Sequence, residues 1–301
     1  NMEQRLISLL SWVFFVCKWT GFTSYSLVID SKDKNKQRKI FKKTTTSIFT
    51  NFVIVFLLTL SIDVRNFYGS FDAVDNISTT ISTTVDAFYF IVLVLMLNFK
   101  QTRVVTTVYR LVEFGELLEE MTRRKMDESK IQRFLRVYTF ILYSNLVVML
   151  VVNWYQALDY DSFVYVFWVL KGFFLKFAAF SGESLICCYM FMAIAIIKEF
   201  NGFLKERNTV GTKKIKQIFQ TYCDLKQDMQ NIAQVIIFVK LLSLVIGLAL
   251  VLYQTIIAAQ LFQEDSDLDL DFILSIYWIL ELILETCLLF CPFIVYYTEV
   301  K

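Results

Sequence analysis

The chain has 301 residues, of which 56% are hydrophobic and only 19% are charged. A soluble domain seldom combines so much apolar surface with so few charges, so the composition indicates a membrane protein. The absence of histidine excludes catalytic triads that use histidine and zinc sites that contain histidine. A formal net charge of +2 argues against a nucleic-acid partner.

The first apolar stretch, residues 6–22, is short and carries Lys18. A signal peptide is one interpretation, but no small-residue cleavage site follows the stretch. We therefore expect an amphipathic helix that lies at the membrane interface. This helix begins a basic N-terminal segment, residues 1–46, which we expect on the cytoplasmic side.

Six further stretches are long and apolar enough to cross about 30 Å of hydrocarbon. They lie at about residues 47–65, 82–99, 137–155, 165–196, 234–262 and 272–297. None alternates apolar and polar residues as a barrel strand would. The fourth and fifth exceed the length that a bilayer requires, so we expect them to tilt or to project beyond it. The sequence thus predicts one all-α domain over residues 1–301.

The connections between these stretches differ in charge. Nine Lys or Arg residues fall in residues 1–46, nine in 100–136 and seven in 198–226, and with Lys301 they make 26 of the 30 basic residues. The loops on the opposite side are acidic, and Arg65 is their only basic residue. The positive-inside rule therefore places both ends of the chain in the cytoplasm.

Ionisable residues inside a membrane are costly, and so they indicate function or pairing. Seven fall within the expected spans: Asp86, Lys171, Lys176, Glu183, Lys240, Glu281 and Glu285. The i, i+4 spacing of Glu281 and Glu285 places both carboxylates on one helical face. They form either a site for a cation or polar ligand, or a structural pair with Lys240 or Lys176 that neutralises buried charge.

Aromatic and amide residues in the outer halves of the spans suggest a pocket for a small polar ligand, open to the outside. Together with the acidic residues, the candidate ligand-binding set is Asp86, Trp154, Tyr253, Gln254, Trp278, Glu281 and Glu285. The aromatic residues also suit interface anchors or packing, and Asp86 also suits a solvated helix end. We expect no cofactor and no metal. No nucleophile–base arrangement is recognisable, so we do not expect an enzyme.

In the order and general character of its segments, the chain resembles an insect gustatory receptor. The N-terminal apolar helix ends in Thr20-Gly21-Phe22, and the fourth span runs out into Asn201-Gly202-Phe203-Leu204, similar to the family's Asn-x-x-Leu turn. Tyr222-Cys223-Asp224-Leu225 followed by Asn231-Ile232-Ala233 resembles the cytoplasmic helix that leads into the family's fifth span. Leu252-Tyr253 resembles the outer part of that span. Odorant receptors share the inverted topology and are the nearest rival family.

The resemblance implies a subunit of a plasma-membrane, ligand-gated cation channel, assembled as a homo- or hetero-tetramer and opened by a small-molecule tastant. Family members also have a seventh, pore-lining span with a Thr-Tyr…Gln-Phe signature, whereas this chain stops at Lys301. Either the sequence is a fragment or the protein is not a conventional channel, so no pore residue is carried over. The alternatives are a six-span transporter, in which Glu281, Glu285 and the intramembrane lysines form an ion or proton relay, and a non-conducting receptor-family subunit.

Overall fold

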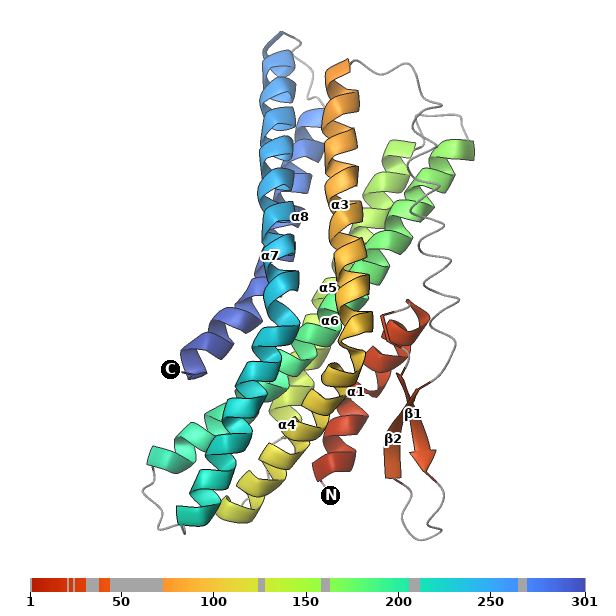
Figure 1. Ribbon diagram of the computed structural model, residues 1–301. Coiled ribbons are helices and arrows are strands. Elements are labelled where there is room, and N and C mark those ends of the chain that lie inside the picture. Colours follow the sequence, from red (N-terminus) through yellow and green to blue (C-terminus); the bar gives the residue numbers. More distant parts are fainter. Residues whose placement is uncertain are drawn as a thin grey trace.

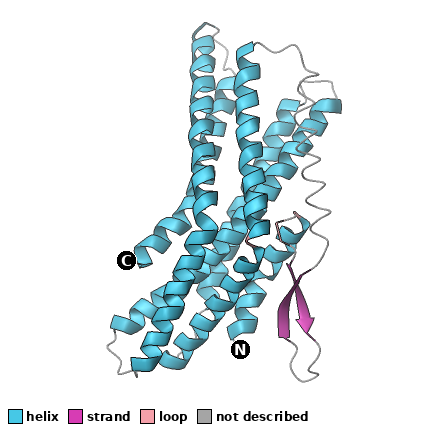
Figure 2. Ribbon diagram, in the orientation of Figure 1, coloured by secondary structure: helices cyan, strands magenta, loops and turns pink. Residues whose placement is uncertain are grey.

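The computed structural model describes nine stretches of the chain. They are residues 2–20, 22–23, 25–30, 38–43, 73–123, 128–157, 163–205, 212–264 and 270–300. Within these stretches the chain forms seven helices and one two-stranded hairpin (Figures 1 and 2). The expected all-α class is confirmed, and the expected first span at residues 47–65 lies outside the described residues.

Helix α1 (Met2–Trp19) confirms the predicted N-terminal helix. It packs against α4 and α6, and one side of it, with Leu10 and Phe14, is fully buried. Phe15 and Trp19 on its other side are exposed. The buried face of the helix thus meets the bundle, and the opposite side is also apolar at Phe15 and Trp19, so the expected polar face is not evident at these positions.

An antiparallel hairpin of β1 (Tyr25–Asp30) and β2 (Arg38–Lys43) follows α1 and lies beside the bundle (Figure 2). The Phe41 ring packs on Phe14 of α1, with the ring centroids 4.5 Å apart. The sequence predicted only a basic N-terminal segment here, and the two strands were not predicted. They are only six residues long, and the lysine content of β2 masks the apolar alternation that signals a strand.

Helices α3 (Ala73–Phe99) and α4 (Gln101–Thr122) meet at Lys100 with a bend of 64°. The hydrogen bonds Lys100 N to Met96 O, 3.0 Å, and Val104 N to Lys100 O, 2.9 Å, bridge the bend. Helix α4 occupies part of the basic connection at residues 100–136 and ends at Arg123, whose φ of 52° is left-handed. Such a residue terminates a helix by turning the chain away from its axis.

Four long helices complete the bundle. They are α5 (Glu128–Ala157), α6 (Phe163–Lys205), α7 (Thr212–Glu264) and α8 (Leu270–Val300). With 43 and 53 residues, α6 and α7 are about 65 and 80 Å long at 1.5 Å per residue. Both exceed the hydrocarbon thickness, as their apolar lengths predicted.

Four described segments are long and apolar enough to cross a membrane: Ile131–Tyr155, Gly172–Lys205, Lys216–Tyr253 and Ile276–Glu299. The bent α3–α4 pair adds a fifth if the two helices form one span. In the most apolar window of α6, 83% of the residues are buried inside the protein, against 28–33% for the other three segments. Helix α6 is therefore the centre around which the bundle packs, while α5, α7 and α8 leave much of their apolar surface for lipid. The count of six spans stays a prediction.

Candidate functional site

Five ionisable side chains from three helices meet inside the bundle. Lys176 and Glu183 lie on α6, Lys240 lies on α7, and Glu281 and Glu285 lie on α8. We call these five residues the charge network. All of them except Lys176 are buried. Burial in apolar surroundings strengthens their mutual attraction, and it also makes any unpaired member costly.

The first part of the network joins α6 to α8. The Lys176 ammonium lies 2.5 Å from Glu285 Oε1 and 3.4 Å from Glu281 Oε1. The two carboxylates share one face of α8, as the i, i+4 spacing predicted. Glu285 therefore makes the closer contact with this lysine, and Glu281 the more distant one.

The second part of the network adds α7 and α3. The Lys240 ammonium lies 3.1 Å from Glu183 Oε1 and 3.4 Å from Glu285 Oε2. The Tyr89 hydroxyl of α3 donates a hydrogen bond of 2.6 Å to Glu183, and the Lys240 ammonium lies 4.7 Å from the centre of the Tyr89 ring. Glu285 thus bridges both lysines, and these contacts together link α3, α6, α7 and α8.

The network is not electrically balanced. It contains three carboxylates and two ammonium groups, so its formal charge is −1 when all are ionised. Glu281 has an ion pair with only one lysine of the network, at 3.4 Å, and the buried hydroxyl of Tyr277, one turn before it, has no hydrogen-bond partner among the described residues. An unbalanced carboxylate beside a hydroxyl with spare bonding capacity suits a polar or cationic guest.

The predicted ligand-binding residues do not all gather here. Trp278 is partly buried against the core, and its ring lies 5.1 Å from that of Tyr277, close in sequence to Glu281. Trp154 on α5 and Tyr253 on α7 are 43% and 45% exposed, and neither contacts the charge network in the described part of the chain. The side chains of Asp86, Lys171 and Gln254 lie outside the described residues.

Sequence reasoning missed Tyr89, which completes the network from α3. A buried tyrosine needs a partner for its hydroxyl, and this requirement was the available signal. The sequence could not indicate that this partner is Glu183, because the two residues are 94 positions apart.

A second polar cluster lies where α4 packs against α7. Asp228 pairs with Arg110 and, at 3.9 Å, with Arg103, while the Lys100 ammonium donates to the Asn231 carbonyl. We call these five residues the α4–α7 clamp. It was also not predicted. It holds the segment after the Lys100 bend against the first half of α7.

One residue of the receptor-like motifs also has a clear contact. The Asn201 amide at the end of α6 donates a 2.8 Å hydrogen bond to the Glu299 carbonyl near the end of α8. Among the described residues, no group of three acidic or cysteine side chains is arranged to hold a metal ion.

Long apolar helices packed around buried charges define a multi-pass helical membrane protein. A family model described as 7tm chemosensory receptor matches residues 10–299. The match covers nearly the whole sequence, and the chain belongs to this family. It agrees with the resemblance to insect gustatory receptors. A search among curated proteins found no significant match.

Proposed function

We propose that this chain is a subunit of a ligand-gated cation channel that responds to a small-molecule tastant. The charge network is the observation that carries the proposal, because together with Tyr89 it joins α3, α6, α7 and α8 inside the bundle of a chemosensory receptor. A ligand that favours one arrangement of these helices shifts the population toward it. Buried ion pairs give such arrangements distinct energies, since each carboxylate must keep a partner.

The site suits a small molecule with hydrogen-bonding groups. Glu281 and the Tyr277 hydroxyl offer polar contacts, and Trp278 offers an aromatic surface. Asp86, Trp154, Tyr253 and Gln254 remain candidate ligand contacts outside the network. Apolar walls with a few placed polar groups are typical of ligand sites.

The charge pattern supports an orientation with both ends of this chain in the cytoplasm, because 26 of the 30 basic residues fall on one side of the expected spans. We place the protein in the plasma membrane as part of a homo- or hetero-tetramer, as the resemblance to gustatory receptors implies. No residue of this chain is assigned to a pore.

The test is to record cation currents from cells that express the chain while a panel of sugars and bitter alkaloids is applied. Glu285→Gln removes a charge that contacts both lysines at 2.5 and 3.4 Å, whereas Glu281→Gln removes the weakly held charge. We expect Glu281→Gln to shift the half-effective concentration of an active compound by about 10-fold, the loss of one charged hydrogen bond. Glu285→Gln should also lower the maximal current.

The control is Glu299→Gln, which changes a partly exposed carboxylate of α8 outside the network. It should leave the response unchanged. Unchanged sensitivity in both network variants, at normal surface expression, would remove Glu281 and Glu285 from the binding site.

A six-span transporter is the second candidate, and one observation favours it. Lys176, Glu285, Lys240 and Glu183 form an unbroken chain of alternating charges that reaches Tyr89. Such chains serve as ion or proton relays in membrane transporters. Uptake of labelled solute without ligand-evoked current would favour this function. Silence of the chain alone, with co-purification of a receptor-family partner, would instead indicate a non-conducting subunit.

A further inference from the structure

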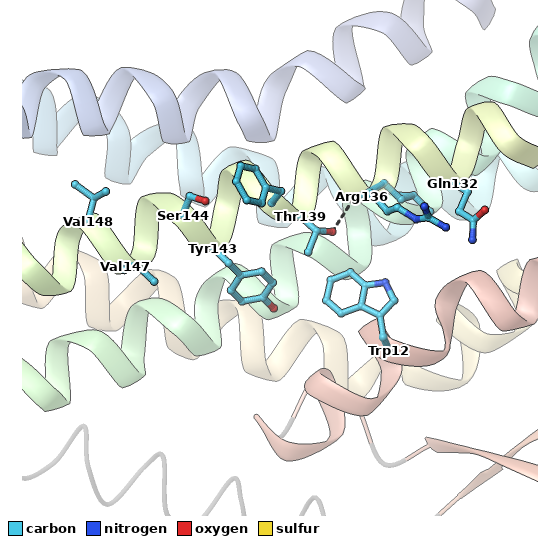
Figure 3. A pocket seen from close by; sticks show the side chains of 10 residues that line it. Trp12, Gln132, Arg136, Thr139, Tyr143, Ser144, Val147 and Val148 are labelled. Carbon is cyan, nitrogen blue, oxygen red and sulfur yellow. Dashed lines mark hydrogen bonds between the residues drawn. The ribbon is translucent and has the colours of Figure 1, made fainter.

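A groove of about 870 Å³ runs along α5 beside α1 (Figure 3), and no residue of the charge network lines it. Its volume is within the range of small-molecule sites. Trp12 reaches toward it from α1, and α5 supplies the other lining side chains. The lining includes Trp12, Gln132, Arg136, Phe140, Val147 and Val148.

One end of the groove is polar and basic. Gln132 and Arg136 lie there on α5, and Trp12 lies opposite them (Figure 3). Arg136 is exposed and forms no ion pair with any described residue. It lies near the start of the membrane-spanning segment Ile131–Tyr155. Guanidinium, amide and indole N–H groups are all donors, and together they suit a phosphate oxygen.

Beyond Arg136 the groove is mainly apolar, although Tyr143 and Ser144 also line it. Phe140, Val147 and Val148 are 74%, 57% and 49% exposed. Thr139 adds no free donor, because its hydroxyl already bonds to the Leu135 carbonyl at 2.7 Å. From Arg136 to Val148 the helix rises about 18 Å, which is close to the depth of one leaflet, about 15 Å.

We propose that this groove binds one anionic phospholipid, with its phosphate at Arg136 and one acyl chain along Phe140, Val147 and Val148. Charge selects the headgroup, since a cation at the membrane surface attracts anionic lipids. The length of the apolar surface selects a chain that spans one leaflet. In the orientation proposed above, Arg136 lies on the cytoplasmic side, where anionic lipids are concentrated. The lipid site does not depend on the tastant or on the channel activity.

The experiment reconstitutes the chain with equal amounts of phosphatidylserine and phosphatidylcholine, extracts it in mild detergent, and counts the retained lipids by native mass spectrometry. The wild type should retain one phosphatidylserine in preference to phosphatidylcholine. Arg136→Gln should lower its retention about 5-fold, the loss expected for one basic residue. Arg133→Gln is the matched control, because Arg133 is an exposed arginine of α5 that does not line the groove.

A second pair of variants tests the acyl-chain half. Val147→Trp fills the groove and should displace the lipid, whereas Val151→Trp enlarges an exposed residue of α5 outside the lining set. Equal losses for Arg136→Gln and Arg133→Gln would overturn the headgroup assignment. Equal retention in Val147→Trp and Val151→Trp would overturn the chain assignment. A retained second copy of the protein, in place of lipid, would show that the groove is a subunit contact.

Discussion

The charge network and the α4–α7 clamp use the same kinds of side chain in different surroundings. In the network, the Glu183, Lys240, Glu281 and Glu285 side chains are 3–7% exposed. In the clamp, Asp228 is 11% exposed, but its partners Arg110 and Arg103 are 35% and 49% exposed. Water can therefore replace a lost partner more readily in the clamp than among these four buried members of the network.

This difference decides what each cluster contributes. An exposed ion pair adds little stability because solvent screens it and long side chains lose entropy. A buried pair adds little in net terms too, but breaking it leaves a charge without compensation. The network therefore constrains which helix arrangements are allowed, while the clamp only favours one position of α4.

The largest effect is expected for Lys240→Met. Among the described residues, this variant deprives Glu183 of its only lysine partner and leaves Glu285 with one. Breaking such a buried pair costs about 3–5 kcal/mol, so thermal unfolding in detergent should occur at a much lower temperature. Lys226→Met, on the same helix but outside the network, is the control. Equal melting temperatures for the two variants would contradict the importance of the network.

A smaller effect is expected at Gly182, next to Glu183. A Cβ atom there would lie 3.1 Å from Leu93 and 3.2 Å from Phe22, both fully buried. Gly182→Ala should therefore destabilise the fold by about 1 kcal/mol through overpacking. At Gly172 on the same helix a Cβ atom meets nothing within 4 Å, so Gly172→Ala should be stabilising by up to about 1 kcal/mol. Thermal unfolding of the pair gives the comparison, and the reverse order would contradict close packing at Gly182.

The smallest effect is expected for the clamp. Asp228→Asn should cost about 1 kcal/mol or less, because Arg103 and Arg110 stay hydrated. The difference from the wild type should shrink further in high salt, which screens exposed pairs. Asp224→Asn, one turn earlier on α7, controls for the loss of charge. A loss as large as that of Lys240→Met would show that the clamp is not a surface feature.

Helical periodicity explains what the sequence could predict. It placed Glu281 and Glu285 on one face and made Lys176 and Lys240 their candidate partners, and both pairings with Glu285 are present. The bond from Tyr89 to Glu183 could not be predicted, because it depends on the rotation of α3 against α6. The positive charge at residues 100–136 indicated a connection between two spans, but it gave no sign of the 64° bend at Lys100.

Helix α7 is one continuous helix of 53 residues, and the charge network contacts it near its middle, at Lys240. Lys240 lies about 28 residues after Thr212 and about 24 before Glu264, so the two arms are about 42 and 36 Å long. Because ion pairs fix α7 at this point, a tilt of the arm toward Glu264 would move the arm toward Thr212 in the opposite direction. The α4–α7 clamp contacts the arm toward Thr212, so a tilt of α7 about Lys240 would also displace α4.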